Sequence, residues 1–535
     1  ECPKALARVP YPLHNVSEHM ACESMGGGGE VMGNVTHSGE ECEKELTSGI
    51  VACKGEGGCG RCWEVQEGEA GTFSVRGRLC KCVEYWDQVL HAPPWVLDTV
   101  RNGYIIPFYS LPTPYARPNQ RTALLEKEFV KGAVWELQKG GYIEVAKETP
   151  VVCSPLSVVT NGVGKKRLVV NLRHVNGFLW KQKFKYEDLR VAMAMFEKGE
   201  WMFSFDLKSG YHHVDVAQHH RKYLGFEWGG VTYTFVMLPF GLSSAPYVFT
   251  KMMRPLVRLW RSKGIKAIVY LDDDIFSSRN ESSAKASSEW VRDTLDKAGW
   301  VCNESKSVWV PTHELVWLGF NLNLSEGSIA VPERKVKALR HSLKVAIGTD
   351  SLVAKTVASL IGKIVSMSLA LGPVARFRTR ALYALLESRQ AWCDVLLVTR
   401  EAGEELRFWV DCFDQFNSQP IWHSPAAVRC VYSDASDTGY GGYIVEHGMH
   451  VAQGNWLPDE AVQSSTWREL VAVGRVLEAI AQKLSNLRVR WFTDNQNVVR
   501  ILQVGSAKSH IQIEALKVFK TCIQYNIRLE PEWIP

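Results

Sequence analysis

Three consecutive carboxylates, Asp272 to Asp274, stand inside the otherwise apolar run AIVYLDDDIF between residues 267 and 276. Ile268, Tyr270 and Ile275 suggest two strands, which puts the acids at the turn of a predicted β-hairpin. Two carboxylates about 4 Å apart repel by about 4 kcal/mol at an effective dielectric of about 20. A divalent cation would relieve this repulsion, and oxygen ligands favour Mg²⁺ or Mn²⁺ over zinc. The alternative is a solvated acidic turn.

The size and composition of the chain predict a multidomain globular protein. It has 535 residues, of which 46% are hydrophobic and 22% charged, and a formal charge of +5 that does not by itself indicate nucleic-acid binding. The longest apolar stretch, residues 364–375, is interrupted by polar residues and is too short to span a bilayer. We therefore expect no membrane association and an intracellular location, in the cytoplasm or nucleus. The start at Glu1 and the end at Pro535 suggest a fragment.

Residues 1–92 differ in composition from the rest and are predicted to be a poorly ordered leader. The leader is rich in glycine and cysteine, and two of its cysteine pairs are closely spaced. A zinc site formed by these two pairs is an alternative that we do not favour, because one residue between the second two cysteines is unusual for zinc. The four cysteines are Cys59, Cys62, Cys80 and Cys82.

Two further segments precede the acidic run. Residues 95–118 are rich in proline and aromatic residues and predict an extended arm, and residues 122–140 have helical spacing. Residues 157–159 and 167–172 predict two strands joined by a glycine-containing tip that carries Lys165, Lys166 and Arg167. Such a hairpin is suited to closing on phosphates, although an ordinary solvated hairpin has the same pattern.

A second acid, Asp206, ends the apolar strand predicted at residues 203–207. Taken alone it would more often be a helix cap than a metal ligand. A strand at 234–238, the turn Pro239-Phe240-Gly241 and a helix from Thr250 to Trp260 follow, and the acidic hairpin comes next.

This order of motifs resembles the fingers and palm of reverse transcriptases from long-terminal-repeat-type and DIRS-like retroelements, over about residues 100–325. The resemblance implies that Asp206, Asp272 and Asp273 bind two metal ions and that Lys306 is the general acid for the leaving pyrophosphate. Asp274 departs from the family pattern, which usually has an apolar residue or glycine there, and we expect it to face solvent.

The same resemblance implies a set of substrate contacts. Tyr211 would lie below the sugar and exclude a 2′-hydroxyl, and the basic residues of the hairpin would contact the triphosphate. A second hairpin would grip the primer end. The Phe-Gly turn would line the nucleotide and template side, and Tyr270, two residues before the acids, would also contact the substrate. The residues so implied are Lys165, Lys166, Arg167, Tyr211, Phe240, Gly241, Tyr270, Trp317, Leu318 and Gly319.

Residues 331–420 carry helical patterns at 353–371 and 381–398 and are expected to form thumb and connection elements. The basic row Arg376, Arg378 and Arg380 is expected either to meet backbone phosphates or to be a solvated helix start.

Residues 421–535 contain a second acid set. Asp434 ends a predicted strand, Glu469 lies in a helix predicted from Ser464 to Ala481, and Asp494 ends another strand. This βββαβα order resembles a ribonuclease H domain, which implies that the three acids bind metal and cleave RNA in RNA–DNA hybrids. The family's fourth acid would follow Pro535, so ribonuclease activity of the fragment is uncertain. The aspartic-protease triplet Asp437-Thr438-Gly439 falls in a predicted turn of this pattern and is not interpreted as a protease site.

The predicted fold class is therefore α/β and α+β multidomain, a right-hand polymerase followed by a ribonuclease H-like domain. The predicted ranges are a leader at 1–92, fingers and palm at 93–330, thumb and connection at 331–420, and a C-terminally truncated ribonuclease H-like domain at 421–535. The expected partners are RNA template, DNA primer, RNA–DNA hybrid and deoxynucleoside triphosphates, with Mg²⁺ or Mn²⁺. The alternative function is a degenerate, non-catalytic remnant that binds nucleic acid.

Overall fold

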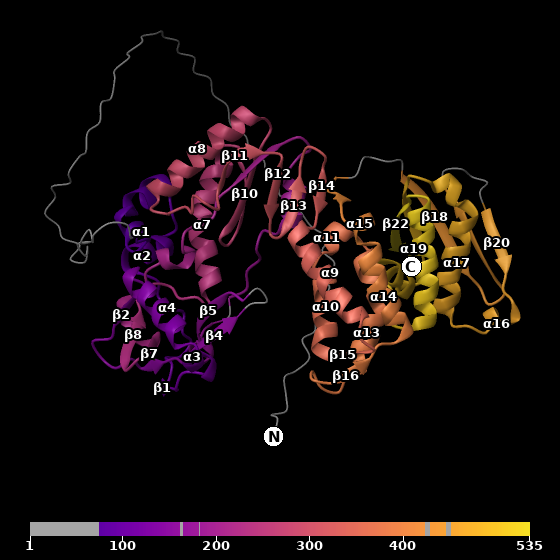
Figure 1. Ribbon diagram of the computed structural model, residues 1–535. Helices are drawn as coiled ribbons and strands as arrows, with labels where there is room; N and C mark the ends of the chain where they lie inside the picture. The colour runs from indigo at the N-terminus through magenta and orange to yellow at the C-terminus, as the bar shows by residue number, and fades with distance from the viewer. Residues whose placement is uncertain (1–73, 161–163, 181, 423–427, 446–450) are drawn as a thin grey trace, which may run out of the picture. The chain divides into compact units, whose positions relative to one another are not determined.

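The computed structural model describes residues 74–160, 164–180, 182–422, 428–445 and 451–535 (Figure 1). The chain divides into the units Glu1–Glu67 and Gly68–Pro535, and every described residue belongs to the second. Most of the Cys-rich leader, with Cys59 and Cys62, and residues 161–163 at the tip of the basic hairpin lie outside the described residues. None of the helices in the described ranges is long and apolar enough to cross a membrane.

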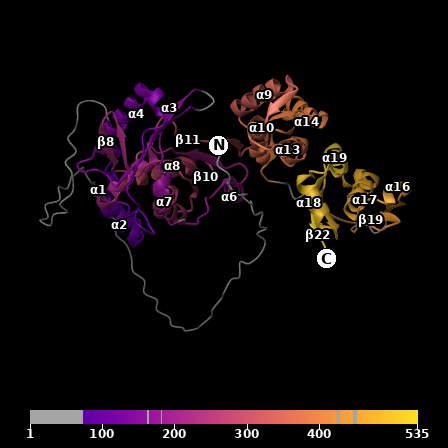
Figure 2. The ribbon, with the colours of Figure 1, turned by 90° about the horizontal axis from the view of Figure 1, so that it is seen from below.

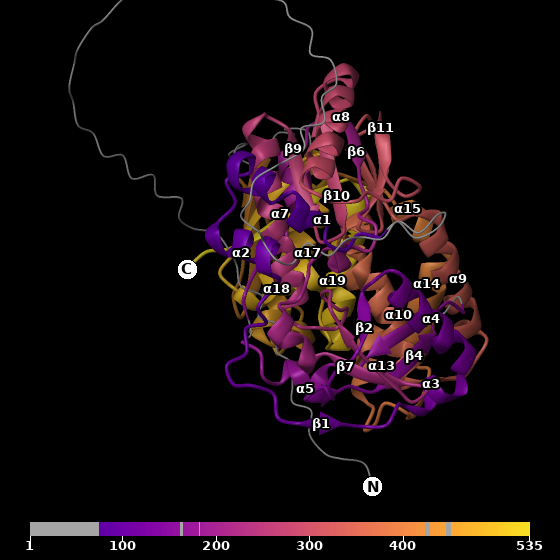
Figure 3. The ribbon, with the colours of Figure 1, turned by 90° about the vertical axis from the view of Figure 1, so that its left-hand side faces the viewer.

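A four-stranded antiparallel sheet carries the acidic run. Its order is β11-β6-β10-β9, with strands Val308–Thr312, Trp201–Ser204, Asp273–Ser278 and Lys266–Tyr270. Helices α7 (Ala245–Ser262) and α8 (Glu281–Lys297) pack against this sheet (Figure 3). The apolar residues of α7 recur every three or four positions, which places one buried stripe against the sheet. Asn280 caps α8 by accepting the Ser283 N–H.

The preceding part of the chain forms a second sheet with the order β1-β3-β7-β8-β2 and a separate β4–β5 hairpin. Short helices connect these strands. The elements are β1 (Tyr115–Ala116), α3 (Arg121–Leu125), α4 (Lys127–Lys139), β2 (Ile143–Val145), β3 (Val152–Cys153), β4 (Leu156–Thr160), β5 (Lys166–Val170), α5 (Arg173–Asn176), α6 (Leu189–Met195), β7 (Gly225–Trp228) and β8 (Val231–Phe235). The predicted helix at 122–140 is therefore two helices, α3 and α4, that meet at Glu126.

Residues 74–92 correct the predicted end of the leader. They form α1 (Arg78–Lys81) and a π-helical turn at Tyr85–Val89, and they pack into the same core as the β6–β10 sheet. Trp86 is fully buried, and its indole N–H donates to the carbonyl of Ala298, 2.9 Å away. The predicted extended arm also begins later than expected, because Pro94–Asn102 form helix α2, with a proline in the first turn where its missing N–H does no harm.

Helices dominate residues 333–416, and α9, α10, α13 and α14 lie together (Figure 2). The elements are α9 (Glu333–Ile347), β15 (Ser351–Val353), α10 (Ala354–Ser366), α11 (Ser368–Leu371), α12 (Val374–Phe377), α13 (Arg380–Glu387), β16 (Val395–Leu397), α14 (Arg400–Asp411) and α15 (Phe413–Phe416). The helix predicted at 381–398 ends at Glu387 instead. The Asp394 carboxylate accepts the backbone N–H groups of Gln390 and Ala391, and the apolar residues that follow pair as β16 with β15.

A small sheet, β12-β13-β14-β17, contacts both these helices and the β6–β10 sheet. Its strands are Glu314–Trp317, Phe320–Asn323, Ser328–Ala330 and Gln419–Pro420. The core beneath it includes Met202, Ile268 and Ile275, which lie on the face of the β6–β10 sheet opposite to α7 and α8.

The C-terminal part is a five-stranded sheet with the order β20-β19-β18-β21-β22. Strand β19 is antiparallel to β18 and β20, whereas β18, β21 and β22 run parallel. The elements are β18 (Val428–Ala435), β19 (Gly439–Ile444), β20 (Val451–Asn455), α16 (Pro458–Ala461), α17 (Ser465–Ile480), β21 (Arg488–Thr493), α18 (Gln496–Val504), α19 (Ser509–Gln524) and β22 (Arg528–Trp533). The predicted βββαβα order is present, with the short helix α16 added before α17. Ser464 is the N-cap of α17 and accepts the Trp467 N–H, and α17 itself runs from Ser465 to Ile480.

Candidate active sites

The β9–β10 hairpin places its acids at one end of the central sheet. Tyr270 pairs with Asp273, and the turn between them is formed by Leu271 and Asp272, with Leu271 in the left-handed region at φ 56°. Asp206, which follows β6, forms an isolated antiparallel bridge with Asp273. The three acids expected to bind metal are thus brought to the same end of the sheet, although they come from segments more than 60 residues apart in the sequence.

Electrostatics at this turn favour a cation. Burial, followed by the charges of Asp206 and Asp273, raises the pKa of Asp272 to about 6. The pKa of Asp273 is also raised, chiefly by burial and then by Asp206. The Lys306 ammonium, 3.5 Å from Asp206 Oδ1, opposes both shifts. Asp272 Oδ1 is buried without a hydrogen-bond partner, so a metal ion would satisfy it.

Gly210 lets the backbone of its own turn lie directly against the Asp272 carboxylate. A Cβ atom at this position would lie 2.2 Å from Asp272 Oδ1, so any side chain would displace the carboxylate. Position 210 therefore has a requirement for glycine that the sequence pattern alone did not reveal.

Tyr211 and Phe240 form an aromatic wall beside the acids. Their ring centroids are 4.9 Å apart, and Tyr211 is 8% exposed whereas Phe240 is 53% exposed. Burial, then the charge of Asp272, raises the pKa of Tyr211, which keeps its hydroxyl neutral. Gly241 follows with φ 95°, and its carbonyl accepts from the Asn176 side chain. Tyr270 packs on Tyr186, with ring centroids 4.8 Å apart.

The basic hairpin is β4–β5, in register from Leu156–Val170 to Thr160–Lys166. Lys166 pairs with Glu126 at 2.6 Å, whereas Arg167 is exposed on the opposite face of β5. Arg167 is thus available to an anionic ligand, and Lys166 would have to leave its carboxylate partner first.

The segment Trp317-Leu318-Gly319 forms the turn of the β12–β13 hairpin, with Leu318 at φ 46° and Gly319 at φ 76°. The Trp317 indole N–H donates to the backbone carbonyl of Asp273 at 3.1 Å, which ties this turn to the acids. Lys335, in the first turn of α9, donates to the Gly319 carbonyl at 2.8 Å. Sequence reasoning missed Lys335 because its partner is fixed only by the packing of the helix on the hairpin.

Asp274 corrects the expectation of a solvent-facing acid. It is 1% exposed, because consecutive residues of β10 point to opposite faces and Asp273 takes the exposed one. Neither Asp274 oxygen makes a hydrogen bond of good geometry, and burial raises its pKa well above the ordinary value, with only a small opposing effect from the backbone of Tyr270. Asp274 lies outside the group of acids that face the turn.

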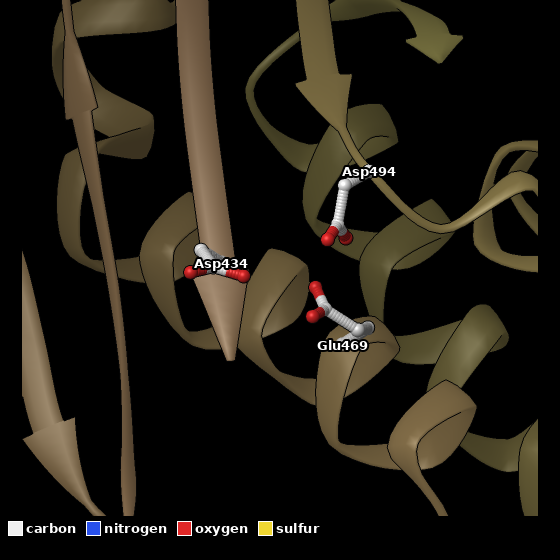
Figure 4. A group of neighbouring side chains, drawn as sticks. All are labelled: Asp434, Glu469 and Asp494. Atoms are coloured by element: carbon white, nitrogen blue, oxygen red, sulfur yellow. The ribbon is translucent and has the colours of Figure 1, made fainter. Parts of the chain in front are cut away.

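A second set of acids lies at the edge of the C-terminal sheet (Figure 4). Asp434 near the end of β18, Glu469 on α17 and Asp494 after β21 bring their oxygens to within 4.8 Å of one another. In the described part of the chain, this is the one group of three or more acids, histidines or cysteines that meets this limit; Asp206, Asp272 and Asp273 are spread more widely. Asp437-Thr438-Gly439 lie at the β18–β19 turn, where Asp437 pairs with Arg468.

Glu469 has the most strongly perturbed environment of the three. It is 4% exposed, and burial followed by the charges of Asp494 and Asp434 raises its pKa to about 8. Its Oε1 accepts the Ala435 N–H at 3.3 Å, whereas Oε2 is buried without a partner. Three carboxylates with an unsatisfied oxygen between them suit a hard divalent cation.

Comparison with known sequences supports a reverse transcriptase of a retroelement. Residues 160–322 match the family described as "Reverse transcriptase (RNA-dependent DNA polymerase)". The chain is 30% identical over 252 residues to the retrovirus-related Pol polyprotein from transposon gypsy of Drosophila melanogaster, covering 46% of this chain and 23% of that protein. It is 25% identical over 421 residues to the Pol polyprotein from transposon opus of the same organism, covering 74% of this chain and 39% of that protein. The chain therefore spans well under half the length of these relatives.

Solved structures show the fold. A foamy viral protease-reverse transcriptase in complex with an RNA/DNA hybrid superposes with a TM-score of 0.54 over 81% of this chain and 58% of that chain, at 17% identity. The same protein in complex with double-stranded DNA gives 0.52 over 81% of this chain and 88% of that chain. The expected reverse-transcriptase polymerase fold is thus confirmed.

Proposed function

We propose that the chain is an RNA-directed DNA polymerase of a retrotransposon, of long-terminal-repeat or DIRS-like type. The observation that carries this proposal is the bridge between Asp206 and Asp273, which gathers three acids at the end of a sheet beside Tyr211 and Lys306. The match of residues 160–322 to the reverse transcriptase family covers all of these residues. Enzymes of this class join a deoxynucleoside triphosphate to a primer end.

Asp206, Asp272 and Asp273 would hold Mg²⁺ or Mn²⁺, and the buried, unpartnered Asp272 Oδ1 fits such an ion. Two bound ions would supply activation of the primer 3′-hydroxyl and charge neutralisation on the leaving phosphates. Lys306 carries a proton on Nζ close to Asp206 and is proposed to donate it to the pyrophosphate. Arg167 and Lys165 are proposed to contact the triphosphate, and Trp317 to Gly319 to hold the primer end.

We also propose that the C-terminal domain is ribonuclease H-like and acts on the RNA strand of RNA–DNA hybrids. Its βββαβα order and the cluster of Asp434, Glu469 and Asp494 support this proposal. The foamy viral relative was solved with an RNA/DNA hybrid. RNA template, DNA primer and the hybrid are accordingly the proposed macromolecular partners.

Primer extension tests the polymerase proposal. Wild-type protein is expected to extend a DNA primer on RNA and on DNA templates with Mg²⁺ or Mn²⁺, and Asp273→Asn is expected to abolish extension on both. Nucleic-acid binding by a folded wild-type protein that extends no primer with either metal would instead favour the non-catalytic remnant.

A further inference from the structure

His213 is a fully buried histidine two residues after Tyr211. Its Nε2 accepts the backbone N–H of Val301 at 3.0 Å, and its Nδ1 lies 3.1 Å from the carbonyl oxygen of Gly210. A backbone N–H can only donate, so Nε2 carries no proton and Nδ1 carries the one that is donated to Gly210. The imidazole therefore bridges two backbone segments in a single tautomer.

The first of these segments is the 3₁₀ turn Gly210–His213, which carries Tyr211. Ser209 enters the turn in the left-handed region at φ 55°, and the Gly210 backbone lies directly against Asp272. A shift of this turn would therefore move Tyr211 and press on a metal-binding carboxylate together. The bond from Nδ1 to the Gly210 carbonyl closes the turn on itself.

The second segment runs from Val301 to Asn303 and lies alongside the residues that carry Asp206. The Val301 carbonyl accepts the Lys208 N–H at 2.8 Å, and the Asn303 N–H donates to the Asp206 carbonyl at 2.7 Å. Lys306 follows in the next turn, with its N–H on the Asn303 carbonyl. His213 thus connects the Tyr211 turn to the segment that fixes Asp206 and Lys306.

The surroundings of His213 hold this bridge in one state. Its ring packs against Trp300, with centroids 4.9 Å apart. Burial, partly opposed by the Gly210 bond, lowers its pKa to about 3, so the ring is neutral wherever a polymerase would work. The Arg78 guanidinium favours the same neutral form of His213.

We infer that His213 is a positioning residue that sets the place of the sugar-selecting Tyr211 relative to the metal-binding acids, an inference that rests on the proposed polymerase function. Loss of the bridge would let the Tyr211 turn shift by a fraction of an ångström. The consequence would be weaker exclusion of ribonucleotides as well as slower extension.

The test compares variants that differ in the bonds they keep. His213→Phe retains a ring of similar size against Trp300 but makes neither hydrogen bond, and His213→Gln keeps a carbonyl oxygen able to accept the Val301 N–H. We expect His213→Phe to slow extension with deoxynucleotides by roughly 10- to 100-fold, because small misplacements at a reacting centre have effects of this order. We also expect its preference for deoxy- over ribonucleotides to fall by at least roughly fivefold, with His213→Gln intermediate.

His220 provides a matched control. It is also buried, accepts a backbone N–H (from Ile106, at 2.9 Å), and has its pKa lowered to about 4. It has no bond to the Tyr211 turn, so His220→Phe is expected to lower the melting temperature without changing sugar preference.

The outcomes separate the two proposals. A wild-type protein that does not extend primers overturns the proposed function. If the wild-type protein is active and the folded His213→Phe variant has an unchanged sugar preference, the proposed role of His213 is overturned. Should His213→Phe not fold, unchanged sugar preference in His213→Gln overturns it in the same way.

Discussion

The two acid sets of this chain consist of the same kind of side chain in different electrostatic settings. At the β9–β10 turn, Lys306 lies 3.5 Å from Asp206, and the pKa of Asp272 is raised to about 6. At the C-terminal sheet, three carboxylates lie within 4.8 Å of one another, and the pKa of Glu469 is raised to about 8. The Lys306 ammonium partly offsets the negative charge of the first set, whereas burial and the mutual repulsion of the carboxylates dominate in the second.

This difference follows from how the acids are mounted. Asp272 lies in the β9–β10 turn and Asp273 begins β10, and the exposed Lys306 side chain pairs with the neighbouring Asp206. Glu469 projects from α17 toward Asp434 and Asp494 (Figure 4) and is buried from solvent. The carboxylate oxygens of the C-terminal set therefore lie within 4.8 Å of one another, whereas those of Asp206, Asp272 and Asp273 are spread more widely.

The largest expected effect is the loss of one activity, primer extension or hybrid cleavage, when one acid set is changed and the other is left intact. Asp273→Asn should lower primer extension by at least about 10³-fold, because a neutral amide neither balances nor holds a divalent cation as a carboxylate does. The same variant should leave hydrolysis of RNA in a preformed hybrid unchanged, and Asp434→Asn should have the reverse effect. Primer extension and hybrid cleavage, measured on both proteins, check this. Loss of both activities in either variant would show that the sites are not independent.

Sugar selection should depend on the turn site alone. Tyr211 is buried between Phe240 and Phe249 beside Asp272, so Tyr211→Ala opens space where a 2′-hydroxyl would lie. Incorporation of ribonucleotides relative to deoxynucleotides should rise by roughly 10- to 100-fold, since the barrier is steric. Single-nucleotide insertion measures the ratio, and Tyr186→Ala, which removes a neighbouring ring, serves as the control. An unchanged ratio would remove Tyr211 from this role.

The resemblance in motif order predicted which acids lie together. Asp206, Asp434 and Asp494 stand at or near strand ends, whereas Glu469 reaches its partners from helix α17. Asp274 was assigned to the wrong face because its orientation depends on the two-residue turn that sets the register of β10. The packing of residues 74–92 depends on contacts such as that of Trp86 with Ala298, 212 residues away, which no local pattern reports. Lys335 and His213 were missed for the same reason, because each makes a hydrogen bond to a backbone atom of another element: Lys335 donates to the Gly319 carbonyl, and His213 accepts the Val301 N–H.

A smaller effect concerns protons released when metal binds. The folded-state pKa of Glu469, about 8, lies above the ordinary 4.5, so the metal-free domain should lose stability as pH rises from about 4.5 to about 8. Mg²⁺ needs the ionised form, so its affinity should rise over the same window, by up to about tenfold per pH unit. Mg²⁺-dependent thermal shifts between pH 6 and pH 9 would measure this.

Glu469→Gln is the control, because it should remove the pH dependence of the Mg²⁺-induced thermal shift. Asp272→Asn should leave that pH dependence unchanged above pH 7. The corresponding window for the turn site is centred lower, near the Asp272 pKa of about 6. A pH dependence unaffected by Glu469→Gln would contradict the assignment of that proton.

The smallest expected effect is on the free energy of unfolding, and it distinguishes a buried carboxyl that has well-placed hydrogen-bond donors from one that has none. Asp274 is buried without a well-formed hydrogen bond, so Asp274→Leu should stabilise the protein by about 1 kcal/mol by removing unsatisfied oxygens. Glu405 is also buried but accepts the N–H groups of Ala381 and Leu382, so Glu405→Leu should destabilise the protein by about 2 kcal/mol. Urea unfolding of the two variants measures both signs. Destabilisation by Asp274→Leu would mean that the buried Asp274 carboxyl has a stabilising structural partner after all.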